Sequence, residues 1–169
     1  MEKIFYRFMK TTFGTLLLAS TEKGVRRIML SAENQLNRLS QEFKEMELIE
    51  DHKFNDQAAD QLGQYFEGER KQFSLPLDLE GTDFQKRVLQ AVQEVPYGAT
   101  RSYQDIAERI GSPKAVRAVG NANRTNPLPL IIPCHRIIGS DGSMTGYGGG
   151  IDLKRKLLEF EKKIVKNLF

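Results

Sequence analysis

The stretch Ile131-Ile132-Pro133-Cys134-His135-Arg136-Ile137 decides how the second half of this 169-residue chain is interpreted. It contains the only cysteine, and one of the two histidines follows that cysteine directly. A thiol becomes a strong nucleophile when it ionises, and a neighbouring imidazole or positive field promotes this. Free cysteines are also among the most buried residues, so a purely structural thiol in a packed strand is the alternative.

The composition favours a globular protein with a hydrophobic core, since 40% of the residues are apolar and 28% are charged. A single cysteine excludes an internal disulfide and a cysteine-rich zinc site, and we expect neither a metal nor a cofactor. No apolar run is long enough to span a membrane, and no signal peptide is evident. We expect an intracellular protein, cytoplasmic in a prokaryotic host or nuclear in a eukaryotic one.

The two halves of the chain differ in charge. Residues 1–80 carry 11 basic and 14 acidic residues (net −3), whereas residues 81–169 carry 14 and 8 (net +6). The segment between Glu108 and Asp141 has no acidic residue but contains Arg109, Lys114, Arg117, Arg124 and Arg136. A basic segment next to the thiol favours a polyanionic partner, although a solvated basic face is the simpler alternative.

The first half predicts an α/β domain over residues 1–80. Alternating residues and turn signals predict a small antiparallel sheet with strands at residues 4–8, 15–19 and 25–30. Apolar spacing predicts a helix over residues 31–47 and a second one around residues 58–66. His52 is expected at the surface, and the extended segment Leu75–Gly81 is expected to separate this domain from a second one at residues 81–169.

The second domain is predicted to be mainly helical, because start and stop signals recur. Thr82 with Gln85, and Ser102 with Asp105, have the spacing of capping boxes, and Gly111 is a typical helix end. We expect a helix-turn-helix from the second and third of these helices.

The third helix is expected to begin at Ser112 as N-cap, with Pro113 in the first position, and to run toward Asn123. Arg117 and Arg124 share one face of it, and its alanines leave a face with little side chain, which suits either helix packing or a nucleic-acid groove: Ala115, Ala118 and Ala122.

Six glycines lie between Gly139 and Gly150, so a flexible loop able to cover a ligand is expected there. A last helix is predicted from Ile151. Lys154 and Glu161 are seven residues apart on it, a spacing that by itself most simply indicates a solvent-facing pair.

The run Asn126–Arg136 resembles the active-site signature of the O6-alkylguanine-DNA alkyltransferases, the methylated-DNA–protein-cysteine methyltransferases. The resemblance continues through Ser102-Tyr103-Gln104, Arg117–Gly120 and Tyr147 with Gly149-Gly150, and it covers about residues 82–162. It implies a ribonuclease-H-like N-terminal α/β domain and a C-terminal domain with a winged helix-turn-helix. The N-terminal half agrees with the family only in size and in the order of its elements.

The resemblance also implies direct repair of O6-alkylguanine, and of O4-alkylthymine, in double-stranded DNA. The damaged base would leave the stack, as chemistry on a paired base requires. Its alkyl group would pass irreversibly to the cysteine, in a single turnover. The protein would act as a monomer, with no membrane partner; whether bound copies cluster on DNA is left open.

Residue roles carried over from the family form a catalytic set and a DNA-contacting set. The catalytic set comprises Cys134 as nucleophile, His135 as base acting through a water, Glu161 orienting the imidazole, Asn126 bracing the loop, Tyr103 donating to the guanine ring and Lys154 neutralising the leaving base. The second set comprises Arg117 entering the base stack, Tyr147 lining the pocket, Gly148, Ala118, Ala122, Asn123, Arg124 and Arg136. Gly148 replaces a serine of some members, which implies a pocket tolerant of alkyl groups larger than methyl.

Three other functions are compatible with parts of the pattern. A cysteine hydrolase normally draws its nucleophile and histidine from distant segments, and here they are adjacent, so an extended backbone would point them to opposite faces. A non-catalytic sensor of alkylated bases would need no cysteine. A transcription regulator would need long polar side chains for base recognition, of which the third helix has few beyond asparagines and arginines.

Overall fold

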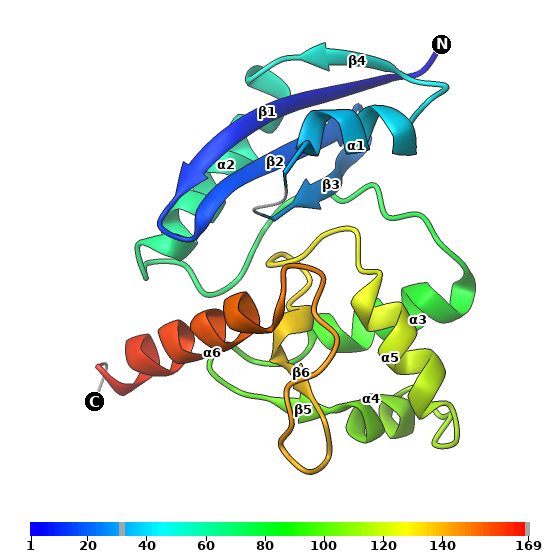
Figure 1. Cartoon of the computed structure of the whole chain (residues 1–169), viewed down its shortest axis with the longest axis vertical. Coiled ribbons are helices and arrows are strands. Elements are labelled where there is room, and N and C mark those ends of the chain that lie inside the picture. The colour runs from blue at the N-terminus through cyan, green and yellow to red at the C-terminus, as the bar shows by residue number, and fades with distance from the viewer. Residues whose placement is uncertain (31–32, 168–169) are drawn as a thin grey trace. The chain divides into compact units, whose positions relative to one another are not determined.

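The computed structural model describes residues 1–30 and 33–167, which form two compact units, Met1–Leu79 and Glu80–Phe169 (Figure 1). Within these residues, no helix combines the length and apolar character needed to cross a membrane. Nor do three or more His, Cys, Asp or Glu side chains gather there in a way that could hold a metal ion.

The N-terminal unit contains a four-stranded sheet of order β3-β2-β1-β4. Its strands are β1 (Lys3–Thr11), β2 (Gly14–Thr21), β3 (Gly24–Met29) and β4 (Glu47–Glu50). The three predicted strands are confirmed and pair antiparallel. β4 was not predicted and pairs parallel with β1, so the expectation of a purely antiparallel sheet is wrong. Only Leu48 and Ile49 are apolar in β4, so its sequence gives a weak strand signal. The strand forms because it pairs with β1, which is distant in the chain.

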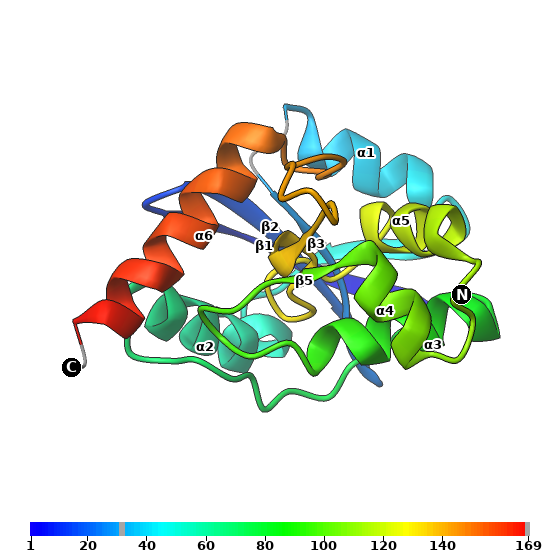
Figure 2. The same cartoon turned by 90° about the horizontal axis from the view of Figure 1, so that it is seen from below.

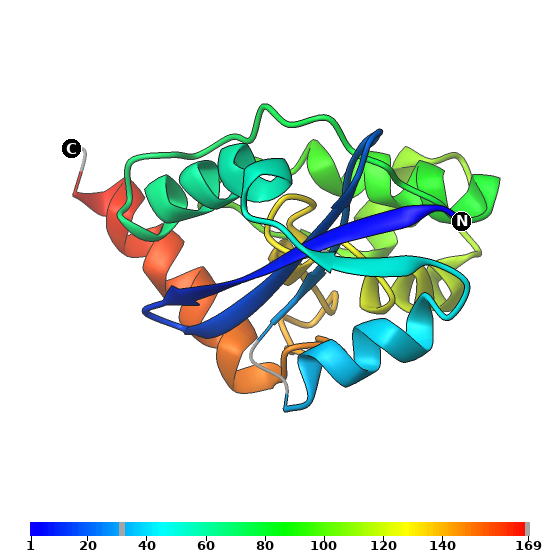
Figure 3. The same cartoon turned by 90° about the horizontal axis from the view of Figure 1, so that it is seen from above.

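Two helices flank the opposite faces of this sheet, α1 (Gln35–Glu42) and α2 (Asp56–Phe66), with the short 3-10 turn η1 (Lys53–Asn55) before α2 (Figure 3). The face toward α1 has a core of Ile4, Leu17, Ala19, Met29, Leu39 and Phe43. α1 is shorter than the predicted helix over residues 31–47, because the chain turns after Glu42 and enters β4 at Glu47. Ser31 and Ala32 lie outside the described residues. His52 is exposed, as predicted.

The C-terminal unit places a two-stranded parallel ladder between helices (Figure 2). Its elements are α3 (Asp83–Gln93), β5 (Arg101–Ser102), α4 (Tyr103–Arg109), α5 (Val116–Arg124), η2 (Cys134–Arg136), β6 (Ile137–Ile138) and α6 (Ile151–Lys166). Both predicted capping boxes are present, at Thr82 for α3 and at Ser102 for α4. α5 packs against α3 and α4, and α6 lies on the other side of the ladder.

The start of α5 differs from the prediction. The helix begins at Val116, with Ala115 as N-cap, so Ser112 does not cap it and Pro113 is not its first residue. The Ala115 N–H donates to the Ser112 carbonyl at 2.9 Å and closes a separate turn. The Pro113 carbonyl accepts from the Gln104 side chain of α4 at 3.1 Å, so the segment belongs to the connection between the two helices.

Candidate active site

The thiol lies on the short 3-10 turn η2. This bend in the backbone is what the adjacent side chains of Cys134 and His135 need if they are to act together. The Cys134 N–H donates to the Ile132 carbonyl at 2.7 Å, and the Arg136 N–H donates to the Pro133 carbonyl at 2.9 Å. Cys134 is 4% exposed and His135 is fully buried. The turn removes the geometric objection that an extended backbone would separate the thiol from the imidazole.

Two asparagines at the end of α5 and just beyond it hold this turn in place. The Asn126 amide donates to the Ile132 carbonyl at 2.8 Å, and its oxygen accepts from the Leu128 N–H at 3.0 Å. The Asn123 amide donates to the carbonyl of Cys134 itself at 3.2 Å. Asn123 is 1% exposed, which corrects its assignment as a DNA contact: it braces the thiol from inside the unit.

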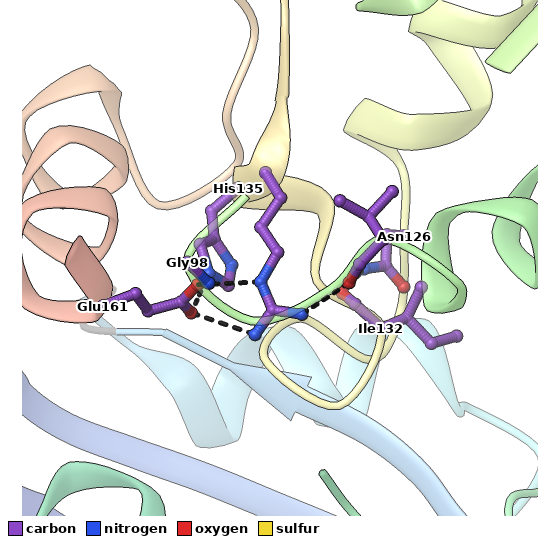
Figure 4. A network of polar contacts seen from close by, with 7 residues as sticks. Gly98, Asn126, Ile132, His135 and Glu161 are labelled. Carbon is purple, nitrogen blue, oxygen red and sulfur yellow. Dashed lines mark hydrogen bonds and ion pairs between the residues drawn. The ribbon is translucent and has the colours of Figure 1, made fainter. Parts of the chain in front are cut away.

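Glu161 on α6 is the centre of a buried polar network (Figure 4). Its Oε2 lies 2.6 Å from His135 Nε2 and 3.1 Å from Arg136 Nη2, and its Oε1 accepts from Arg136 Nε at 2.8 Å. The Gly98 N–H also donates to Oε1, at 3.2 Å. Burial alone would raise the pKa of Glu161, but the bonds from His135 and Arg136 outweigh it and lower the pKa to about 2.

An ionised Glu161 determines the tautomer of His135. A carboxylate only accepts hydrogen bonds, so His135 Nε2 must carry the proton between them. Burial lowers the pKa of His135, and the contacts with Glu161 only partly offset this. The imidazole is therefore neutral, with the lone pair of Nδ1 free to accept a proton.

Gly98 is required where it approaches the network. Its φ is +79°, and a Cβ atom there would lie 2.6 Å from Val165 Cγ2. The close approach lets the Gly98 N–H reach Glu161. The sequence analysis missed this residue, although its position directly after Pro96-Tyr97, where the chain turns out of α3, is a signal for a tight turn.

The solvent-facing alternative for Lys154 and Glu161 is wrong, because both side chains are fully buried. Lys154 Nζ donates to the carbonyls of Ile137 at 2.5 Å and Thr145 at 3.0 Å. Burial lowers the pKa of Lys154. Both residues come from α6: Glu161 bonds His135 and Arg136 of η2, and the charge of Lys154 acts on Cys134.

The thiol is not ionised in the free protein, contrary to the expectation that His135 raises its thiolate fraction. Burial raises the pKa of Cys134 to about 11, and the Asn126 side chain and the charge of Lys154 only partly counter this. Because a neutral thiol is a weak nucleophile, another group must remove the thiol proton as the sulfur attacks.

We expect Cys134 to react slowly with iodoacetamide in the folded protein. A pKa of about 11 instead of the ordinary 9.0 reduces the thiolate fraction at pH 8 about 100-fold. Mass spectrometry should show at least this ratio between the unfolded chain in guanidinium chloride and the native protein. Equal rates in the two states would show that the thiol is neither shielded nor perturbed.

A groove of about 790 Å³ opens on the same unit and is lined by Tyr103, Lys114, Ala115, Arg117, Ala118, Gly120, Asn121, Arg124, Thr145 and Gly146. We call it the basic groove, because its three charged residues are cations. Four of the predicted site residues meet here: Tyr103, Arg117, Ala118 and Arg124. Asn121, Thr145 and Gly146 were missed, since nothing in their spacing indicated a shared surface.

The thiol does not line the basic groove. Thr145 of the glycine-rich loop (residues 139–150) joins the groove to α6, because its carbonyl accepts from both the Tyr103 hydroxyl, at 2.9 Å, and Lys154, at 3.0 Å. Tyr147 is 8% exposed and sits beside His135, with ring centroids 6.5 Å apart. Tyr103 and Lys154, the two donors expected to act on a base, are thus hydrogen-bonded to this loop.

Burial corrects two further DNA contacts expected from the sequence. Arg136 is 5% exposed, and its guanidinium donates to Glu161 and, through Nη1 at 2.8 Å, to the Val95 carbonyl. Ala122 is 5% exposed and packs inside the unit, whereas Ala118 is exposed at the basic groove. The alanines of α5 therefore serve two faces rather than one.

Comparison with known proteins identifies both units. The family description "6-O-methylguanine DNA methyltransferase, ribonuclease-like domain" matches residues 4–79, and "6-O-methylguanine DNA methyltransferase, DNA binding domain" matches residues 83–163. The methylated-DNA–protein-cysteine methyltransferase of Methanosarcina barkeri is 45% identical over 94% of this chain and 98% of its own. The constitutive one of Bacillus subtilis is 45% identical over 94% and 95%.

Solved structures agree with this. The crystal structure of the Mycobacterium tuberculosis protein OGT in complex with DNA is 43% identical to this chain, with a TM-score of 0.82, and the match covers 95% of this chain and 94% of that one. The chain therefore belongs to the 6-O-methylguanine DNA methyltransferase family.

Proposed function

We propose that this protein repairs O6-alkylguanine in double-stranded DNA by moving the alkyl group onto Cys134. One observation carries the proposal: the only cysteine is held on a buried turn beside a neutral histidine whose other nitrogen is bound to an ionised glutamate. The names of the relatives, and the DNA complex of one of them, support the same activity.

The array can carry out the transfer with a complete balance of atoms. The thiol proton passes through a water to His135 Nδ1, and Glu161 stabilises the imidazolium that forms. The sulfur attacks the alkyl carbon, so that an S–C bond forms as the C–O bond breaks, and the electron pair of that bond stays with the guanine. Lys154 stabilises the negative charge that develops on the guanine, which then takes a proton from water, while the imidazolium of His135 returns one proton to water; the net products are S-alkylcysteine and neutral guanine.

Each molecule is expected to act once. A thioether is a poor leaving group, so the alkyl group is not expected to leave Cys134 once it has been transferred. The hydrolase and sensor alternatives are less well supported: the first lacks a defined oxyanion site in this arrangement, and the second does not require the buried acid–base array.

The basic groove is the proposed DNA-binding surface. Lys114 and Arg124 are exposed and would contact backbone phosphates, so binding should weaken as salt increases. Arg117 is proposed to enter the base stack in place of the extruded nucleotide. Tyr103 can donate to the base only after its bond to the Thr145 carbonyl breaks, so we infer that the glycine-rich loop shifts when the base enters.

Gly148 is proposed to widen the alkyl pocket. A Cβ atom at this position would have its nearest neighbour, the Arg124 carbonyl, at 3.8 Å, an ordinary contact distance. Space therefore does not forbid the serine found in some members, and the glycine leaves the volume of that side chain unfilled. Tyr147 is proposed as one wall of this pocket.

We also infer the finer features of the fold and assembly. Residues 1–80 would be the ribonuclease-H-like domain, and residues 81–169 the DNA-binding and alkyl-transfer domain with a winged helix-turn-helix made by α4, α5 and the β5–β6 ladder. The protein would act as a monomer in the cytoplasm. The family description of residues 4–79 as ribonuclease-like supports the first of these inferences.

Intact-protein mass spectrometry tests the proposal. After incubation with a duplex that contains one O6-methylguanine, the wild-type protein should gain the mass of one methylene, located at Cys134 by peptide mapping. Cys134→Ser should gain nothing while still binding the lesion. More than one equivalent of product per protein, or no mass gain in the wild type, would contradict the proposal.

A further inference from the structure

Several buried polar atoms without a hydrogen bond belong to residues around the thiol. Among the described residues, His135 Nδ1, Tyr147 Oη and Asn123 Oδ1 are buried and form no hydrogen bond. His135 adjoins Cys134 in the chain, and Asn123 holds the Cys134 carbonyl. Buried polar groups are nearly always satisfied in folded proteins, so unsatisfied ones gathered at one place indicate a site that binds something polar.

Two of these atoms have opposite hydrogen-bonding capacity. His135 Nδ1 is an acceptor, because Nε2 carries the proton that bonds Glu161. The Tyr147 hydroxyl is a donor: burial, the charge of Glu161 and, once it ionises, that of Cys134 raise the pKa of Tyr147 well above 10, so it keeps its proton. The titratable and charged groups facing this place are Cys134, His135 and Arg136 from η2, and Lys154 and Glu161 from α6.

The geometry allows the two atoms to share one small molecule. The rings of His135 and Tyr147 are nearly perpendicular, at 81°, with centroids 6.5 Å apart, and no direct bond joins them. A buried water typically makes about three hydrogen bonds. Cys134 Sγ–H, Tyr147 Oη–H and His135 Nδ1 offer two donors and one acceptor, which is a complete set for such a water.

We propose that the Tyr147 hydroxyl is a positioning residue of the proton relay and holds the water that connects Cys134 to His135. The water accepts hydrogen bonds from Tyr147 and from the thiol, and donates one to His135 Nδ1. As the thiol ionises, the water takes the thiol proton and passes one of its own protons to Nδ1, while the tyrosine keeps its proton. The products of the step are a thiolate and an imidazolium. This inference rests on the proposed function and adds a residue to its mechanism.

Tyr147→Phe tests the inference, since it removes only the hydroxyl. With methylated duplex in single-turnover conditions at pH 7, the transfer rate should fall about 10- to 100-fold, the effect of losing one hydrogen bond in the transition state. The deficit should shrink as the pH approaches 11, because hydroxide then removes the thiol proton without the relay. A merely structural role would slow transfer equally at every pH. Tyr65→Phe, at a buried tyrosine of the other unit, is the matched control and should transfer at the wild-type rate.

A double-mutant cycle completes the test. If Tyr147 acts through His135, adding Tyr147→Phe to His135→Ala should cause no further loss. An unchanged rate, a deficit independent of pH, or a full additional loss in the His135→Ala background would each overturn the inference. Should Tyr147→Phe fail to fold, 3-fluorotyrosine at position 147 keeps the hydroxyl but changes its donor strength, and an unchanged rate with it would overturn the inference equally. A wild-type protein that transfers no methyl would instead refute the proposed function.

Discussion

Glu161→Ala is expected to destabilise the protein by about 3–5 kcal/mol and to abolish measurable alkyl transfer. The carboxylate accepts hydrogen bonds from His135, Arg136 and Gly98 in a fully buried position. Removing it leaves the positive charge of the Arg136 guanidinium buried without a neighbouring anion. An uncompensated buried charge is strongly destabilising. Urea unfolding monitored by circular dichroism measures the loss of stability.

The same residue should make the protein sensitive to acid. The pKa of Glu161 is about 2 in the folded state and 4.5 ordinarily, so the folded state favours the ionised form. This shift in pKa contributes about 3 kcal/mol to the free energy of unfolding, at 1.36 kcal/mol for each pKa unit. The contribution is complete above pH 4.5 and is lost as the pH falls toward 2. Glu161→Gln should remove this part of the pH dependence.

Glu159→Ala provides the matched control, because Glu159 lies two residues earlier on α6 and is exposed. It should change stability by no more than about 0.5 kcal/mol. Equal effects of the substitutions at 159 and 161, or a Glu161→Ala protein as stable as the wild type, would contradict the role of the buried network.

His135→Ala is expected to slow alkyl transfer by about 10²- to 10⁴-fold at pH 7, the range typical of losing a general base. The buried thiol of Cys134, whose pKa is about 11 in the wild-type protein, would have no positioned acceptor for its proton in this variant. The fold should survive, because Glu161 keeps its two bonds to Arg136 and stays ionised. Rapid-quench measurement of methyl transfer, with lesion affinity measured separately by fluorescence anisotropy, separates chemistry from binding.

The second histidine of the chain is the natural control. His52 is exposed and belongs to the N-terminal unit, so His52→Ala should transfer methyl groups at the wild-type rate. A His135→Ala protein that reacts as fast as the wild type would exclude the imidazole as the base. Loss of lesion affinity in parallel with the rate would instead indicate that the substitution disturbs the pocket.

Local signals in the chain were sufficient for much of the C-terminal unit. The capping boxes at Thr82 and Ser102 are formed by residues three positions apart, so their geometry is contained in the sequence. α6 begins at Ile151, as predicted, after the glycine-rich loop. Strand β4 and the early end of α1 were not predicted, because pairing with β1 and burial against the sheet, which are long-range effects, override weak local preferences.

The sequence by itself determined the chemistry available to this protein: one thiol, a histidine beside it, a basic segment without acids, and a motif shared with one family. Only the tertiary structure decided which side chains serve that thiol. It buried Lys154 and Glu161, turned Arg136 and Asn123 inward as braces, and left Tyr147 Oη without a partner next to His135. The physical reason is that burial and pairing depend on contacts between residues 11 to 63 positions apart, as between Asn123 and Cys134 (11 positions), His135 and Glu161 (26) or Gly98 and Glu161 (63), which no local pattern encodes.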